Sequence, residues 1–181
     1  MNADTIRELV NEVSAEPVLK AEDIPDLELY VDQVTTLMEN KLGATRRHPS
    51  DKIMTKTMIN NYSKEHLLPE SNKKKYSRKH LLLLQLIYHY KSVLSISDIH
   101  TLLDPLIADE EALIRFYQEF VADYEAQMLD LALETDKLET LDTEDLRPAI
   151  ASLLTRAAIE KHLAERMIDL MVHDKEDNPP L

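Results

Sequence analysis

Apolar residues recur at steps of three and four along most of the chain, which is the spacing of one face of an α-helix. The pattern predicts a helix over residues 4–14 and another from about 27 to 42, after Pro25. Three shorter helices are predicted over about 56–66, 78–93 and 96–103. Two longer ones are predicted over about 110–136 and 145–172. The sequence therefore predicts an all-α fold.

Capping residues support these boundaries, because Ser, Thr and Asp side chains accept hydrogen bonds from the first free N–H groups of a helix. The predicted caps are Asp23 or Asp26 for the second helix, and Thr55, Ser77, Ser95 and Asp109 for the helices after it. Gly43 is placed to end the second helix, Pro105 to end the fifth, and Pro148 falls in the first turn of the last.

The long helix over 110–136 carries a heptad seam, an apolar stripe with alternating steps of three and four. Its members are Ile114, Tyr117, Val121, Tyr124, Met128, Leu131 and Leu138, with Thr135 as the polar gap. Two interpretations stay open. The seam packs inside the chain, for example on Ile150, Leu153, Leu154 and Ala157 of the last helix, or it pairs two chains as a dimer or binds a partner.

Composition narrows the class of protein further. Gly43 is the only glycine, which argues against a β-rich fold, since tight strand turns use glycine heavily. The chain has no cysteine, so disulfides and thiolate metal sites are excluded. The first residues lack the apolar core of a signal peptide, and no apolar run approaches the ~20 residues of a membrane span. A cytoplasmic protein without membrane contact is expected.

Charge is distributed unevenly along the chain. The formal net charge is −13, yet residues 41–91 hold 12 Lys or Arg against 3 Asp or Glu, a net of +9. The remaining residues carry −22. Binding depends on the local field, so the basic segment indicates a nucleic-acid surface in an acidic protein. The alternative is a solvated basic face that docks on the acidic half of the same chain.

The basic segment has the layout of a winged helix-turn-helix. A short capped helix is followed by "LLP", a loop with three consecutive lysines, a tyrosine and a serine-capped apolar helix. In such a motif the short helix enters the major groove and the loop lies along the phosphates.

The residues resemble the mercury-resistance-regulator (MerR) family of transcription factors. The matching stretches are "MINNYSKEHLLP", "NKKKYS" and "LSISDI" within residues 55–103. The positions that match are Ile59, Tyr62, Leu67, Leu68, Tyr76, Ser77, Ser95, Ile96, Asp98 and Ile99. The resemblance implies contact with duplex DNA and a dimerising helix directly after the module, a place that residues 110–136 occupy.

This chain departs from the MerR pattern at several positions. Asn60 replaces a phosphate-contacting arginine and Asn61 a tyrosine, while Lys73 and Lys74 replace the wing tyrosine and arginine. A basic insertion, 43–54, separates the two helices of the motif. His66 and Asn72 stand where the family has glycines, and both residue types tolerate the left-handed conformation better than most.

A second resemblance covers more of the chain. The stretches "IPDLELYVDQVTTLMENKL", "TKTMINNYSKEHLLPESNKKKYSRKHLLLLQLIYHYK" and "LSISDIHTLL" resemble the bacterial domain of unknown function 1836 family. That family has no established activity, and the resemblance implies a bacterial cytoplasmic protein.

The candidate DNA-binding residues lie on the short helix and the lysine loop. They are Thr55, Lys56, Thr57, Asn60, Asn61, Tyr62, Lys64, Lys73, Lys74, Lys75, Tyr76 and Arg78. An asparagine can bond adenine at two points, and lysines neutralise phosphates with little base information. Tyr62 and Tyr76 fit either DNA contact or anchoring in the core.

Catalysis and metal binding have little support. His162, Glu165, Asp169 and His173 share a helical stripe, but that stripe lies away from the apolar face, and metal ligands need to converge with a supporting shell. The sequence shows no nucleophile motif, phosphate-binding glycine loop or paired-carboxylate signature. No metal, cofactor or enzyme activity is predicted.

Together these observations predict two domains. Residues 1–103 hold N-terminal helices and a MerR-like winged helix-turn-helix, and residues 104–181 form an acidic helical hairpin for dimerisation or partner binding. The predicted function is a transcriptional regulator that binds double-stranded DNA as a homodimer, with no effector identified by the sequence. The alternative is a protein-interaction adaptor on the same scaffold, without catalysis.

Overall fold

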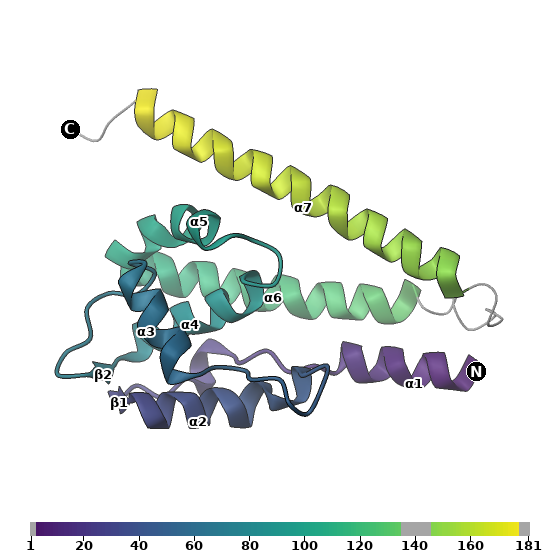
Figure 1. Ribbon diagram of the computed structural model, residues 1–181, viewed down its shortest axis with the longest axis horizontal. Helices are drawn as coiled ribbons and strands as arrows, with labels where there is room; N and C mark the ends of the chain where they lie inside the picture. Colours follow the sequence, from purple (N-terminus) through teal and green to yellow (C-terminus); the bar gives the residue numbers. More distant parts are fainter. Residues whose placement is uncertain (1–2, 135–145, 178–181) are drawn as a thin grey trace.

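A computed structural model describes residues 3–134 and 146–177. Within these residues helices dominate, and short 3-10 turns lie at Ala21–Asp23 and Gly43–Thr45 (Figure 1). In chain order the elements are α1 (Ala3–Ser14), β1 (Leu29–Tyr30), α2 (Val31–Leu42), α3 (Lys56–Lys64), β2 (Lys75–Tyr76), α4 (Arg78–Tyr90), α5 (Ile96–Ala108), α6 (Glu110–Glu134) and α7 (Leu146–Asp177).

A small antiparallel sheet corrects the expectation of an all-α fold. Leu29 pairs with Tyr76 and Tyr30 with Lys75, so β1 and β2 tie the start of α2 to the start of α4. Residues 27–30, expected to begin the second helix, are not helical, and Leu29–Tyr30 form β1 instead. The Tyr30 N–H donates to Gln33 Oε1 at 2.8 Å, so Gln33 caps α2 in place of Asp23 or Asp26.

Helix α2 ends at Gly43, as predicted, but without a left-handed residue. Gly43 has φ −58° and ψ −26°, which is right-handed backbone, and it leads directly into a 3-10 turn. The Thr45 hydroxyl then donates to the Leu42 carbonyl at 2.8 Å. The chain therefore leaves α2 by tightening the helix, a common way to satisfy the last carbonyl groups.

Helix α4 is the centre of the core, as its apolar content predicted. Every residue from Leu81 to Ile87 is buried, including the polar Gln85, whose amide donates to Met38 Sδ at 3.2 Å. One continuous cluster of buried side chains runs from Leu19 to Val121 and draws on α2, α3, α4, α5 and α6. The expected domain boundary after residue 103 falls inside α5, within this shared core.

Helix α5 continues through Pro105, where the sequence predicted its end. A proline inside a helix costs about 3 kcal/mol, because it removes one hydrogen bond and crowds the preceding turn. Leu103 before it is fully buried, and Leu106 and Ile107 after it pack partly buried against the core. Burying large apolar side chains contributes about 1.5–3 kcal/mol each, so packing on both sides of Pro105 outweighs the break.

The seam on α6 packs inside its own chain. Tyr117 is fully buried, Val121 is nearly so, and the Tyr117 hydroxyl donates to the Leu19 carbonyl. Ile114, Tyr124, Met128 and Leu131 are half-buried, and α6 contacts α1, α4 and α5. The seam therefore packs inside the chain, as one of the two interpretations had it, but on α1, α4 and α5 rather than on the last helix. Thr135 and Leu138, the gap and last member of the seam, lie outside the described residues.

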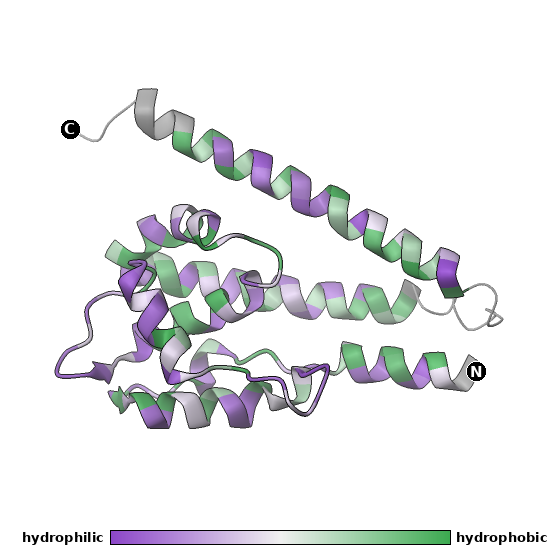
Figure 2. Ribbon diagram, in the orientation of Figure 1, coloured by the Kyte–Doolittle hydropathy of each residue, from purple (hydrophilic) through white to green (hydrophobic). Residues whose placement is uncertain are grey.

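Helix α7 is longer than expected and ends at Asp177. Pro148 lies in its first turn, where the missing N–H removes no helical hydrogen bond. The helix runs diagonally across one side of the molecule and contacts α5 (Figure 1). Figure 2 shows hydrophobic and hydrophilic residues alternating along its length. None of the described helices is long and apolar enough to cross a membrane.

Candidate nucleic-acid interface

Helix α3 is fixed at its amino-terminal end by the predicted cap. The Met58 N–H donates to the Thr55 hydroxyl oxygen at 3.1 Å. Ile59 is fully buried and Tyr62 nearly so, and both belong to the core cluster. Thr55 and Tyr62, two of the candidate DNA contacts, therefore hold the helix in place.

The opposite face of α3 is exposed and polar. At 100° per residue, its side chains span an arc of about 140° on the helix. Its members are Lys56, Thr57, Asn60, Asn61 and Lys64, all of them exposed. Helix α3 contains no acidic residue, so this face combines two positive charges with amide and hydroxyl groups that suit base edges and phosphates.

Helix α3 ends in a Schellman motif. The Leu67 N–H donates to the Tyr62 carbonyl at 2.9 Å, and the His66 N–H donates to the Ser63 carbonyl at 3.3 Å. His66 is left-handed, with φ 56°. This conformation was expected because His66 stands at a position where the MerR pattern has a glycine. The fully buried Leu67 then turns the chain back against the core.

A tight turn at residues 72–75 forms the tip of the lysine loop, which extends beyond the body of the molecule (Figure 1). The Lys75 N–H donates to the Asn72 carbonyl at 2.9 Å. Lys73 and Lys74 have φ 50° and 63°, so both central residues are left-handed, as in a type I′ turn. Asn72 itself does not have a positive φ. The expectation that Asn72 would adopt the left-handed conformation in place of a glycine was therefore wrong.

Strand β2 anchors the base of the loop. Lys75 Nζ lies 3.6 Å from a carboxylate oxygen of Glu28 and 5.7 Å from the centre of the Tyr30 ring. Tyr76 is buried and packs edge-on against His80, with ring centres 5.4 Å apart. Tyr76 therefore belongs to the support of the loop rather than to its surface.

His80 ties the two ends of the loop together. The Ser77 N–H donates to His80 Nδ1 at 3.1 Å, and His80 Nε2 lies 3.1 Å from the Pro69 carbonyl. This pair of contacts requires a neutral ring with its proton on Nε2. Burial lowers the pKa of His80, because desolvation penalises the imidazolium form. No pattern in the sequence indicates this role of His80, since Pro69 and His80 meet only after folding.

Two further candidates are engaged by the protein itself. Arg78 Nη2 donates to the Ala21 carbonyl at 2.8 Å and fixes the segment before β1. Lys56 forms an exposed ion pair with Asp32 at the start of α2. Asp32 and Glu28, which sequence reasoning did not single out, therefore hold two of the candidate lysines.

Seven of the twelve candidates remain exposed on one helix and one turn. They are Lys56, Thr57, Asn60, Asn61, Lys64, Lys73 and Lys74. Thr55, Lys75 and Arg78 are half-buried in contacts that support these elements, and Tyr62 and Tyr76 are buried. We call the seven exposed residues the presenting set and the other five, which hold α3 and the loop in place, the supporting set.

The histidine stripe on α7 does not assemble a site in the part of the chain that is described. No group of three or more His, Asp or Glu side chains there could hold a metal ion. Glu165 is paired with Lys161, and Asp169 accepts from Arg166 at 3.0 Å. The side chain of His173 lies outside the described residues.

The comparisons with known proteins agree with the extent of the core. No curated protein and no solved structure matches the chain significantly. The sequence pattern of the DUF1836 family, a domain of unknown function, matches residues 19–120, so this chain belongs to that family.

Proposed function

We propose that this protein is a non-enzymatic transcriptional regulator that binds duplex DNA through a winged helix-turn-helix. The motif would comprise β1, α2, α3, the lysine loop with β2, and α4. The order of these elements and the pairing of β1 with β2 support this proposal. The observation that carries it is the presenting set, in which seven exposed polar side chains lie on α3 and on the turn after it.

In this proposal α3 lies in the major groove. Asn60 and Asn61, in its middle, reach base edges, where an asparagine amide can bond adenine at two points. Lys56 and Lys64 lie two turns apart along α3 and contact phosphates on either side of the groove. The free N–H groups of the first turn add a partial positive charge beside Lys56 and Thr57.

The lysine turn contacts the phosphate backbone beside the groove. A left-handed residue other than glycine costs about 1–2 kcal/mol, and Lys73 and Lys74 both adopt this conformation. Asn-Gly would form the same turn with less strain. Strain retained at an exposed, charged tip supports a binding role for the two ammonium groups.

The charge distribution favours encounter with DNA in one orientation. Residues 41–91 carry +9, and the rest of the chain carries −22. An acidic remainder repels phosphates, whereas the basic segment attracts them and steers the approach.

Two chains acting together would place two α3 helices at successive half-sites, which supports binding as a homodimer.

A protein-interaction adaptor is the second candidate. The exposed apolar side chains of α7 favour it, because such a face suits a protein partner better than a nucleic acid. The adaptor would use the same scaffold, and a complex with another protein that weakens with salt would indicate that the basic segment takes part in the contact.

Fluorescence anisotropy with labelled duplexes tests the proposal. Fragments from the neighbourhood of the gene and a scrambled duplex would be titrated at several salt concentrations. We expect log affinity to fall with log salt at about 0.9 per phosphate neutralised. Affinity that stays flat from low to physiological salt would reject DNA binding.

Three variants assign the roles. The double change Lys73→Ala and Lys74→Ala should weaken all duplexes equally and reduce the salt slope by about two. Asn60→Ala should lose about 1–3 kcal/mol of discrimination at one base pair while keeping non-specific affinity. Arg115→Ala, an exposed arginine of α6 outside the basic segment, is the matched control and should change neither.

A further inference from the structure

Helix α7 exposes an extensive apolar surface. Among its described side chains only Ile168 is a buried apolar residue. The exposed large apolar residues have between 36% and 65% of their surface accessible. They are Ile150, Leu153, Leu154, Ile159, Leu163, Met167, Leu170, Met171 and Val172. Monomeric proteins rarely expose apolar patches beyond a few hundred Å², so this helix is expected to have a cover.

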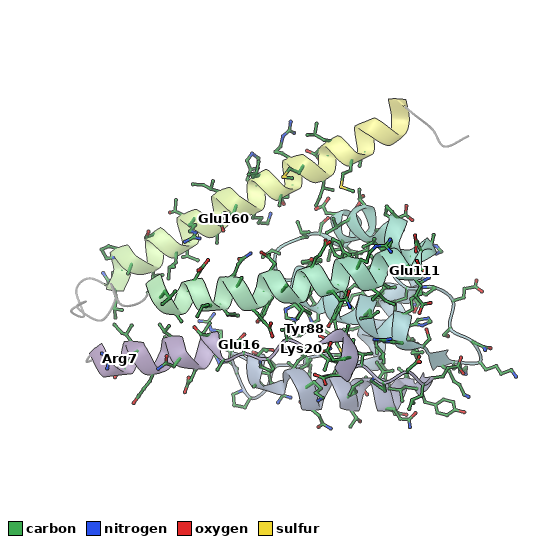
Figure 3. All side chains as sticks on the ribbon, turned by 180° about the vertical axis from the view of Figure 1, so that it is seen from behind. Arg7, Glu16, Lys20, Tyr88, Glu111 and Glu160 are labelled. Carbon is green, nitrogen blue, oxygen red and sulfur yellow. The ribbon has the colours of Figure 1, made fainter. Side chains whose placement is uncertain are left out.

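One stripe of α7 has the spacing of a coiled-coil seam. Its steps alternate between four and three residues through Leu146, Ile150, Leu153, Ala157, Glu160, Ala164, Met167 and Met171. Glu160, midway along the helix, is its one polar member (Figure 3). Arg156 Nε donates to Glu160 Oε1 at 2.9 Å and balances that charge.

The rest of the described chain covers this stripe only toward its C-terminal end, where α7 contacts α5 and Ile168 is buried beside it. The seam of α6 is turned toward α1, α4 and α5, and the ribbons of α6 and α7 diverge away from their connected ends (Figure 1). Leu129 and Leu133, on the last turns of α6, are themselves 62% and 61% exposed. The seam that could pair two chains is therefore on α7, since the one on α6 is used within the core.

The charges of α7 fix a relative orientation. Residues 146–159 carry two arginines and no acid, a net of +2, whereas residues 160–177 carry three basic and six acidic residues, a net of −3. Two such helices side by side repel when parallel and attract when antiparallel. Helix dipoles favour the same antiparallel arrangement.

We propose that a second copy of this chain covers the α7 stripe, with the two α7 helices antiparallel about a two-fold axis near Ala157 and Glu160. Such an interface is isologous, which means that the α7 stripe of one chain packs against the same stripe of the other chain. Ala157 lies at the centre and Ala164 about two turns beyond it, and both permit close approach, while the larger apolar residues fill both ends. This pairing specifies the homodimer of the proposed function, but it depends on no contact with DNA.

Sedimentation of the full chain tests the pairing. The wild-type protein should sediment as a dimer at micromolar concentration, and Leu153→Asp should shift it to the 20.9 kDa monomer, with at least a tenfold weaker association. Ile159→Asp is the matched control, since Ile159 is also exposed but lies about 120° around the helix from Leu153. Circular dichroism checks that both variants stay helical.

A cysteine pair tests the orientation, because the chain has no cysteine of its own. Glu160→Cys lies near the axis and should form a disulfide-linked dimer on mild oxidation. Ile150→Cys should not, since an antiparallel pair separates its two copies by about 25 Å at 1.5 Å per residue.

A wild-type monomer at high micromolar concentration, or an Ile150→Cys dimer without a Glu160→Cys dimer, overturns the proposal. Loss of DNA binding alone does not, since dimerisation is measured without DNA.

Discussion

At the residue scale, a substitution in the lysine turn should change stability and DNA affinity in opposite directions. Lys73 and Lys74 occupy left-handed conformations that glycine adopts without strain. We expect Lys74→Gly to raise the free energy of unfolding by about 1 kcal/mol, measured by urea denaturation, and to weaken DNA binding.

The same turn gives its own controls. Lys74→Arg should keep affinity, because the positive charge remains, and Lys74→Asn should lose affinity while keeping a residue that tolerates φ near 60°. A Lys74→Gly protein with unchanged affinity would show that the Lys74 ammonium group makes no phosphate contact.

His89 provides a prediction about acid stability. It is packed among the rings of Tyr88, Phe120 and Tyr124, with ring centres 5.2–5.3 Å away, and its Nε2 is buried without a hydrogen-bond partner among the described residues. Burial lowers the pKa of His89 to about 4, because the charged ring cannot be solvated there.

The sign of the pH effect follows from this shift. As pH falls, His89 takes up a proton near pH 6.5 in the unfolded chain but only near pH 4 in the folded one. Protonation therefore favours the unfolded chain, and the free energy of unfolding falls as pH drops from about 6.5 to 4. The loss from this residue should reach roughly 3 kcal/mol. Urea unfolding of His89→Phe should show a shallower decline than wild type, whereas His48→Gln, at an exposed histidine, should match wild type. If the free energy of unfolding fell equally with pH in wild type and in His89→Phe, the prediction for His89 would be wrong.

At the element scale, the core helix and most caps were predictable, although the cap of α2 was not, and pairings distant in sequence were not. Thr55, Ser95 and Asp109 cap their helices as predicted, since a cap depends on neighbours within three residues. Strand β1 was missed because two residues show no clear alternation, and its partner β2 follows two further helices. Pro105 was misjudged because the packing of α5 outweighs a local rule.

The pairing of α2 with α3 yields a prediction about affinity. Asp32, in the first turn of α2, holds Lys56, and both side chains are more than half exposed. Such a pair contributes little to stability, about 0–1 kcal/mol. Asp32→Asn should release Lys56 and remove a charge that repels phosphate, so DNA affinity should rise a few-fold, most at low salt.

Glu119→Gln makes the same charge change at an exposed position on α6 and should leave affinity nearly unchanged. If Asp32→Asn instead weakens binding, the Lys56–Asp32 pair orients α3 rather than competing with DNA. Anisotropy at two salt concentrations separates the two effects.

At the scale of the whole molecule, the candidate interface lies within the family domain, and the α7 stripe lies outside it. The match over 19–120 includes α3, the lysine turn and most of the core. The charge of residues 41–91 predicted a basic surface in this part of the chain. It could not divide that surface into presenting and supporting residues, because the burial of Tyr76 and the bond from Arg78 to Ala21 depend on the folded chain.

The two heptad seams give the last prediction, because the same substitution should act differently on each. Val121 is only 8% exposed and belongs to the core, so Val121→Asp places an unpaired carboxylate among apolar side chains. We expect this variant to lose several kcal/mol of stability, with a lowered unfolding midpoint in thermal and urea denaturation. Leu153→Asp, at a residue 48% exposed, should unfold nearly as wild type at concentrations where both proteins are monomeric. A Val121→Asp protein with wild-type stability but no dimer would return the dimer seam to α6, because only an exposed Val121 could accept a charge without cost to the fold.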